Sequence, residues 1–198
     1  MQKNGTDEGQ MEVEDRPSYL HGSREIVSWR NMTSLKYWTR DSCNKIRGTD
    51  GTVFPPGVTS NSELSFFSPE ACRSVSLVYE ADEEVQSVSG LRFIFPDTLL
   101  ESAEKHYPNT CYCKDYDDFE EDDYSMCLKK GAIDLSTCRG APLATSYPHF
   151  LDADPEYLQD VQGLTPDKSL HSSSIVVEPV STHVLYSLPL PGCVHGKY

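Results

Sequence analysis

The sequence predicts a mainly β protein, built from short strands with long connections. Two segments alternate apolar and polar residues, which is the pattern of antiparallel strands that bury one face. The apolar faces carry Val75, Leu77 and Tyr79 in the first segment and Leu91, Phe93 and Phe95 in the second. The 198 residues include 13 prolines, a composition typical of loop-rich proteins. The sequence has no long amphipathic helical pattern and no internal repeat.

Other strands are expected along the chain. Residues 1–22 are polar and predict an exposed lead-in. Asp50-Gly51 predicts a turn, and Pro55-Pro56 excludes a central strand. Short apolar or aromatic runs that predict strands lie at residues 24–29 (REIVSW), 35–38 (LKYW), 131–136 (GAIDLS) and 172–180 (SSSIVVEPV).

One short helix is expected within residues 151–164. Asp154 is placed to cap it, Pro155 suits its first helical position, and Gly163 can end it. Such a helix has room for about two turns.

The charge and hydropathy of the chain exclude some classes of protein. A formal net charge of −14 argues against nucleic acid as a partner, because nucleic-acid binding needs clustered lysine and arginine. No run approaches the ~18 apolar residues of a membrane helix, and the polar N-terminal residues do not resemble a secretory signal. The chain as given is therefore expected neither to span a membrane nor to direct its own export.

Seven cysteines raise the question of a metal or redox site. They are Cys43, Cys72, Cys111, Cys113, Cys127, Cys138 and Cys193. Structural zinc usually needs two close pairs, but Cys111 and Cys113 form the only one, and a thioredoxin-like site would need CxxC. We therefore expect no metal site and no cofactor.

The acidic run at residues 115–123 suggests calcium as an alternative. It holds seven carboxylates, but an EF-hand loop needs glycine at its sixth position, and counting from Asp115 places Glu120 there. Loose calcium binding is a minor alternative, and a solvated surface loop is the favoured interpretation.

Disulfides fit the cysteines best. Residues two apart on a strand share a face, so Cys111 and Cys113 are expected side by side, each with a different partner. Six cysteines allow 15 connectivities, and the sequence alone does not choose among them. Asn4 and Asn31 begin Asn-x-Thr glycosylation sequons. Disulfides and glycans both require the secretory route, so the chain is expected to be an internal piece of a longer exported protein.

No catalytic site is expected. The chain lacks GxSxG, HExxH, P-loop and GxGxxG motifs. His149 has no partner at metal-ligand spacing, and a structural role fits it better than a catalytic one. A metal-dependent hydrolase would rest only on the acidic run and scattered histidines.

Several blocks, in order, resemble the class B scavenger receptor family, which includes fatty-acid translocase, the lysosomal integral membrane proteins, croquemort and the insect sensory neuron membrane proteins. The similarity extends from about Cys43 to Val180 and is specific only when the blocks are taken together. The blocks are CNKIRGTDGTVFPP (43–56), ELSFFSPEACRSVSLVYE (63–80), the CYC block at 111–113, GAIDLSTCRGAPLATSYPHFLDADPEYLQDVQGLTPD (131–167) and SIVVEPVS (174–181).

The resemblance implies a fold and a disulfide pattern. The implied fold is part of an irregular antiparallel β-barrel ectodomain with short helices, pierced by an apolar tunnel and held by a membrane helix near each end. Leu91, Phe93 and Phe95 are then candidates for either the tunnel wall or the core. The implied disulfides are Cys43–Cys111, Cys72–Cys138 and Cys113–Cys127.

The resemblance also divides the chain. Residues 23–180 correspond to a partial ectodomain, preceded by the lead-in at 1–22 and followed by a divergent tail at 181–198 that contains Cys193. Both membrane helices and the segment of the family's apical helical bundle are missing, and Gly57 replaces the aromatic residue usual after the proline pair. A partial gene product is therefore expected.

The implied function is that of a non-catalytic segment of a membrane scavenger receptor that binds or transfers hydrophobic ligands. The expected ligands are fatty acids, lipoproteins, odorants or apoptotic-cell lipids, and membrane contact would come from parts absent from this chain. The full-length protein is expected on the cell surface or the lysosomal membrane, with this part outside the cell or in the lumen. The alternative is a soluble secreted ligand-binding module without membrane anchors.

Overall fold

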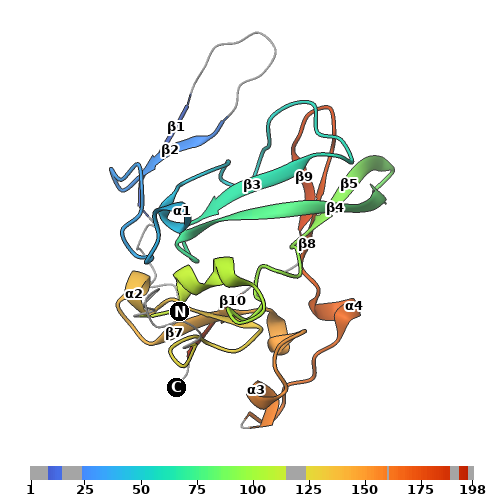
Figure 1. Cartoon of the computed structure of the whole chain (residues 1–198). Coiled ribbons are helices and arrows are strands. Elements are labelled where there is room, and N and C mark those ends of the chain that lie inside the picture. The colour runs from blue at the N-terminus through green and yellow to red at the C-terminus, as the bar shows by residue number, and fades with distance from the viewer. Residues whose placement is uncertain (1–8, 15–23, 115–123, 160, 188–191, 196–198) are drawn as a thin grey trace.

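The computed structural model describes residues 9–14, 24–114, 124–159, 161–187 and 192–195, the last by backbone only. A curled five-stranded antiparallel sheet forms one layer, and a three-stranded sheet with short helices forms the other (Figure 1). A two-stranded ribbon extends from the first layer. The predicted fold class, a mainly β partial barrel with short helices, is confirmed.

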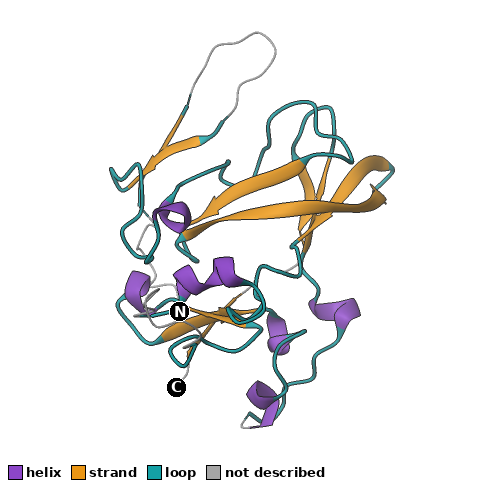
Figure 2. Cartoon of the chain, in the orientation of Figure 1, coloured by secondary structure: helices purple, strands orange, loops and turns teal. Residues whose placement is uncertain are grey.

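Strands dominate the upper layer, and every α-helix is a single turn of four residues (Figure 2). The helices are α1 (Asp41–Asn44), α2 (Ser136–Arg139), α3 (Glu156–Gln159) and α4 (Lys168–His171), with 3-10 turns η1 (Tyr107–Tyr112) and η2 (Pro148–Phe150). The strands are β1 (Met11–Val13), β2 (Ile26–Trp29), β3 (Glu63–Ser68), β4 (Arg73–Val85), β5 (Val88–Ile94), β6 (Ala132–Asp134), β7 (Leu143–Ser146), β8 (Ser174–Val177), β9 (Val184–Ser187) and β10 (Gly192–His195).

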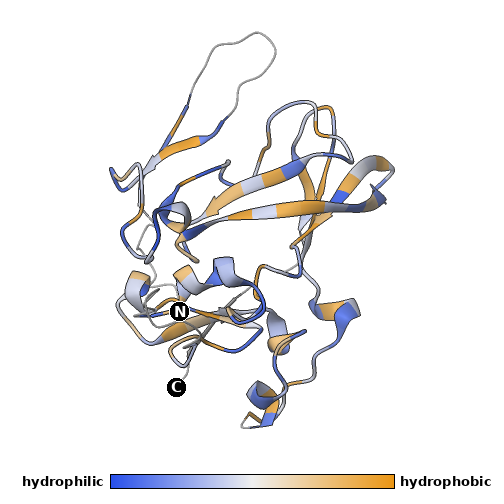
Figure 3. Cartoon of the chain, viewed as in Figure 1, coloured by the Kyte–Doolittle hydropathy of each residue, from blue (hydrophilic) through white to orange (hydrophobic). Residues whose placement is uncertain are grey.

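The β4–β5 hairpin forms the centre of the sheet β3-β4-β5-β8-β9. Gln86 and Ser87 join the two strands with φ of 50° and 68°, the left-handed pair that a two-residue hairpin turn requires. Leu77 and Phe93 are fully buried on one face of the hairpin, and Ile175 of β8 lies directly opposite Phe93. Apolar and polar stretches alternate along these strands, as the sequence predicts (Figure 3).

The segment 48–54 contacts both outer edges of this sheet. At the β3 edge, the Phe67 N–H donates to the Thr49 carbonyl at 2.8 Å. At the β9 edge, Val53 forms an antiparallel bridge with His183. Phe54 follows with a side chain that is only 1% exposed and belongs to the main hydrophobic cluster. The sheet is therefore closed by a short strap from the same chain.

The length of the strap requires the sheet to curl. A flat sheet would separate Thr49 from Val53 by the four spacings within the sheet plus one at each edge, about 29 Å in all. The chain between these residues covers at most about 14 Å. The outer strands must therefore bend toward each other, which is the geometry of a partial barrel.

The second layer contains the sheet β10-β7-β6, and disulfides join it to the first. Cys72, in the β3–β4 turn, is bonded to Cys138 of α2, and Cys43 of α1 is bonded to Cys111 of η1. A third bond joins Cys113 to Cys127. These three bonds join the pairs that the family resemblance implies.

The strand predicted at residues 35–38 is wrong, and the side chain of Asn44 explains why. Asn44 Oδ1 accepts the N–H groups of Tyr37 and Trp38 at 3.1 and 3.0 Å, and Nδ2 donates to the carbonyls of Trp38 and Arg40 at 2.7 and 3.1 Å. A single buried amide thus satisfies the backbone groups that a sheet partner would otherwise satisfy. The segment is a loop that carries Trp38 into the core.

The strand assumed for Cys111 and Cys113 is also wrong. Cys111 lies in η1, and Cys113 follows as its last capping residue, with its N–H donating to the Thr110 carbonyl at 3.0 Å. Pro108 stands at the start of this turn, where its missing N–H costs nothing. The two cysteines nevertheless have different partners, because the turn ends between them.

The helix expected within 151–164 is shorter than predicted. α3 is one turn, Glu156–Gln159, and residue 160 lies outside the described part of the chain. Asp154 Oδ1 accepts the Glu156 N–H at 3.0 Å, as a capping residue does. Gly163 has a left-handed φ of 91°, but it lies beyond the helix.

A substitution at Gly48 tests whether the contact between the strap and β3 stabilises the fold. The φ of Gly48 is 81°, and an added Cβ would clash with the backbone carbonyl of Ser65 on β3. We expect Gly48→Ala to lower the free energy of unfolding by about 3 kcal/mol or more, because a backbone clash adds to the strain of a left-handed alanine. Thermal or denaturant unfolding of the oxidised chain measures the change.

Gly57→Ala is the matched control. Gly57 has a similar φ of 87°, but an added Cβ would meet no atom within 4 Å. We expect a loss of about 1–2 kcal/mol from backbone strain alone. Equal losses for the two variants would show that the contact of Gly48 with β3 contributes little.

Candidate functional site

A cleft of about 1050 Å³ opens between the two layers where β5 ends. Its lining is amphipathic, because apolar side chains alternate with lysines, aspartates and serines. The walls are Glu80, Arg92 and Ile94 of the sheet, Phe95 and Leu100 of the connection after β5, the segment 151–155, and residues from α4 to the start of β8.

Several residues in and directly before one wall of this cleft, the segment 151–155, have left-handed backbone conformations. His149, Phe150 and Asp152 have φ of 54°, 54° and 56°, which is uncommon for residues with side chains. The His149 ring stacks on His171 with a centroid distance of 4.2 Å. His149 Nδ1 accepts the Thr165 N–H at 3.1 Å. His149 therefore holds this segment in place, which is the structural role that the sequence favours.

Two cations in the lining of the cleft, Arg92 and Lys130, form ion pairs with neighbouring carboxylates. Arg92 Nε lies 2.6 Å from Glu83 Oε2, and this hydrogen bond raises the pKa of Arg92. Lys130 Nζ lies 3.3 Å from Glu101 Oε2. Burial opposes ionisation of Glu101, but the Ser102 N–H and Lys130 together hold its pKa below the usual range. These cations stabilise neighbouring carboxylates and are already paired.

A second, smaller cleft of about 50 Å³ has an arginine in a mostly apolar lining. Arg73, the first residue of β4, is only 8% exposed, and its Nε and Nη1 atoms have no hydrogen-bond partner among the described residues. Its guanidinium lies 3.9 Å from the centroid of the Tyr112 ring. Burial lowers the pKa of Arg73, against the opposing effects of Tyr112 and Tyr147. This cleft shares Phe95 and Leu100 with the large one.

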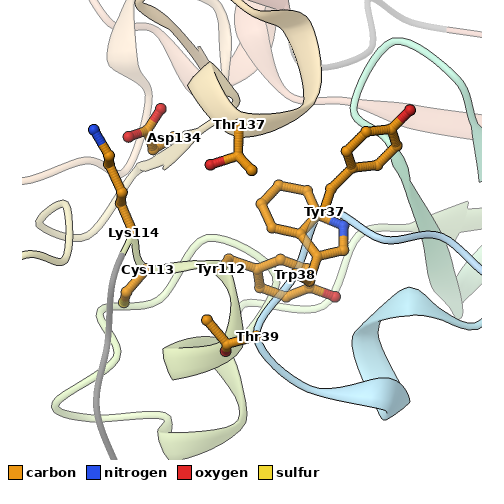
Figure 4. Close-up of a pocket in the computed structure, with 8 residues that line it drawn as sticks. All are labelled: Tyr37, Trp38, Thr39, Tyr112, Cys113, Lys114, Asp134 and Thr137. Atoms are coloured by element: carbon orange, nitrogen blue, oxygen red, sulfur yellow. The ribbon is translucent and has the colours of Figure 1, made fainter.

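On the other side of Tyr112 lies an aromatic pocket of about 250 Å³ (Figure 4). Trp38 meets Tyr112 edge-on, with centroids 4.9 Å apart and an interplanar angle of 82°. The Trp38 Nε1–H donates to the Cys72 carbonyl at 2.7 Å. Thr137 of the second layer lies next to these rings, and Asp134 lines the pocket farther from them, so the pocket lies between the layers.

The disulfides surround this cluster of Trp38, Arg73 and Tyr112. Arg73 follows Cys72 directly, and Tyr112 stands between Cys111 and Cys113. Each of the two residues is therefore fixed by a cross-link at a neighbouring position. The disulfides therefore constrain the backbone on which the cation and the ring are placed.

The structure places the predicted site residues in different surroundings. Phe93 is fully buried in the core, and Leu91 packs against the core from a half-buried position. Phe95 is also a buried member of the core, and it lines both clefts. Asn31 is exposed on a turn after β2, with φ of 60°. Asn4, the acidic run 115–123 and the side chain of Cys193 lie outside what the structure describes.

Sequence reasoning missed Arg73, although a signal was present. Arg73 has the same parity as Val75, Leu77 and Tyr79, so the strand pattern itself places a cation on the apolar face. In the described part of the chain, no group of three or more histidine, cysteine, aspartate or glutamate side chains is arranged to hold a metal ion.

Comparisons with known proteins agree on one family. A model of the CD36 family matches residues 1–187. Scavenger receptor class B member 1 of Rattus norvegicus is 38% identical over 157 residues, which are 79% of this chain and 28% of the relative. Lysosome membrane protein 2 of Mus musculus is 32% identical over 186 residues, 93% of this chain and 36% of the relative. Sensory neuron membrane protein 1 of Aedes aegypti is 36% identical over 169 residues, 85% of this chain and 29% of the relative.

The chain spans about a third of the length of the curated relatives that it matches. No helix among the described residues is both long enough and apolar enough to cross a membrane. The family match covers 187 of the 198 residues and includes both sheets of the two main layers up to β9. The chain therefore belongs to the CD36 family.

Proposed function

We propose that this chain is the ligand-binding part of a membrane scavenger receptor, and that it binds hydrophobic or amphipathic molecules without catalysis. The large cleft at the end of β5 is the observation that carries this proposal. Its volume of about 1050 Å³ lies at the upper end of the range usual for small-molecule sites. Most of its lining residues are charged residues or serines, and Ile94, Phe95 and Leu100 belong to a smaller apolar part, a combination that suits an amphipathic molecule.

The relatives support a receptor in a membrane. One relative is a scavenger receptor, and two others are membrane proteins of the lysosome and of sensory neurons. None of these names specifies a ligand, so fatty acids, lipoproteins, odorants and apoptotic-cell lipids remain candidates. In this proposal residues 23–180 form the ectodomain part and face the outside of the cell or the lysosomal lumen. The alternative is a secreted binding module without anchors.

The apolar face of the sheet is the less suitable place for a ligand. Phe93 is completely buried among other side chains, so a ligand could not reach it without displacing the core. Phe95 has left the strand and lines both clefts. The proposed binding surface is therefore centred on the half-buried Ile94, where the edge of the core at Phe95 and Leu100 lines the cleft.

Filling the cleft tests the proposal. Ile94 is half-buried on the cleft wall of β5, so Ile94→Trp adds volume to the cleft without emptying the core. We expect the affinity for the uncharged fluorescent probe Nile red to fall by about tenfold or more, which corresponds to about 1.4 kcal/mol or more. Fluorescence titration of the secreted, oxidised chain measures the affinity.

Val88→Trp provides the matched control. Val88 begins the same strand, is 42% exposed and does not line the cleft. The affinity of the Val88→Trp variant for Nile red should equal that of the unmodified chain. If Ile94→Trp binds the probe as well as Val88→Trp does, the cleft is not the binding site.

Glycosylation of Asn31 tests the proposed compartment. Asn31 and Thr33 are both exposed on the turn after β2, so the sequon is accessible. We expect Asn31 to carry an N-glycan when the chain is targeted to the secretory route, and peptide mass spectrometry detects it. Thr33→Ala should remove that glycan and leave folding intact, because Thr33 lies outside the core. An unmodified Asn31 in fully secreted chain would contradict the prediction.

A further inference from the structure

Arg73 has no role in the ion pairs described above. The residue is only 8% exposed, and two buried nitrogen atoms of its guanidinium have no hydrogen-bond partner among the described residues. Tyr112 and Tyr147, whose charges oppose the effect of burial on the pKa of Arg73, are not carboxylates. A buried cation of this kind is costly unless an anion or a set of hydrogen-bond acceptors compensates it.

The Tyr112 ring compensates only part of this cost. A guanidinium over an aromatic face gains a modest electrostatic attraction, but the ring does not accept the in-plane N–H groups. Arg40 makes the same kind of contact with Tyr107, 4.5 Å from the ring centroid, but Tyr107 is 53% exposed and water reaches it. Arg40 therefore lies over a ring that is open to solvent, whereas Arg73 is itself buried. The burial of Arg73 is what distinguishes the two arginine–tyrosine contacts.

The lining of the small cleft indicates what kind of anion it would accept. Besides Arg73, it is formed mainly by Phe66, Val75, Phe95, Leu99 and Ile133, and the carboxylate of Glu70 belongs to an exposed residue. A volume of about 50 Å³ is several times the ~10–15 Å³ that a single water needs, so a small head group fits. The apolar surroundings favour an anion that is attached to an apolar chain over a free inorganic ion.

The two clefts share Phe95 and Leu100, so they adjoin each other. A head group at Arg73 would thus lie next to a volume that is large enough for an acyl chain. We propose that Arg73 is the residue that selects the charge of the ligand: it pairs with the anionic head group of a single-chain amphiphile whose apolar chain extends past Phe95 into the large cleft. This inference rests on the proposed hydrophobic-ligand function and assigns the residue that selects the charge of the ligand at that site.

The geometry of arginine suits this role. A guanidinium presents paired N–H donors that match the two oxygens of a carboxylate, and such charge-assisted pairs are stronger and more directional than neutral hydrogen bonds. Cys72–Cys138 and Cys111, next to Tyr112, hold the guanidinium and its ring in position before a ligand arrives. The ligand therefore meets a preformed, dehydrated cation.

Two ligands with the same chain and different heads separate charge selection from general apolar binding. Oleate and oleyl alcohol are titrated below their aggregation limits against delipidated, oxidised chain, with Trp38 emission as the readout because Trp38 contacts Tyr112. We expect oleate to bind at least tenfold more tightly than oleyl alcohol. In Arg73→Met this preference should disappear while oleyl alcohol binding remains, and in Arg73→Lys part of it should remain. Acetate should not bind measurably.

A stability measurement distinguishes a binding role from a structural one. Removing a buried cation that has unsatisfied donors should leave the melting temperature of the ligand-free chain unchanged or higher in Arg73→Met. Oleate should then raise the melting temperature of the unmodified chain and of Arg40→Met, the matched control at a half-buried arginine over an exposed ring, but raise that of Arg73→Met much less. A large drop in melting temperature for ligand-free Arg73→Met would overturn the proposal in favour of a structural role.

The outcomes also separate this inference from the proposed function. If neither oleate nor oleyl alcohol binds the unmodified chain, the proposed function fails. If both bind with equal affinity, and Arg73→Met changes neither affinity, the clefts bind hydrophobic ligands and the role of Arg73 is refuted.

Discussion

The fold depends on the strap at residues 48–54, which pairs with β3 at one end and with β9 at the other. Because the strap is too short to cross a flat sheet, it requires the outer strands to bend toward each other. Thr49 and Phe54 are each 1% exposed, so the strap is also part of the core. The same short segment therefore covers two unpaired edges and completes the hydrophobic cluster beneath them.

The second layer packs at the open end of the curled sheet. This layer consists of β6, β7 and the short helices, and disulfides join it to the first layer. Short helices have little stability of their own, so covalent bonds to α1 and to the β3–β4 turn matter most where packing is weakest. The cluster of Trp38, Arg73 and Tyr112 lies at this junction. Disulfides at neighbouring positions therefore add to the contacts that the cluster makes itself.

The sequence predicted those parts of the fold that depend on local patterns. Val75–Tyr79 and Leu91–Phe95 alternate as expected, because a strand with one buried face leaves a period of two in the sequence. The loop at 35–38 could not be predicted in this way, because Asn44 replaces the sheet partner with side-chain hydrogen bonds. The strap was recognised only as a turn, since its pairing with His183 joins positions 130 residues apart, from 53 to 183. Contacts at that separation leave no periodic signal.

The position of the candidate site follows from the point at which β5 leaves the sheet. Phe93 and Phe95 share a face by parity, and from the sequence they are equivalent candidates for a core or a binding role. β5 ends at Ile94, so Phe93 remains within the pleated surface and is covered by the core, whereas Phe95 turns toward the gap between the layers. Arg73 starts β4 at the same end of the sheet, beside Val75 and Phe95 in the lining of the small cleft. An apolar contact and a buried cation thus meet at the end of the barrel wall. At that end, the linings of both clefts include Phe95, a member of the core cluster.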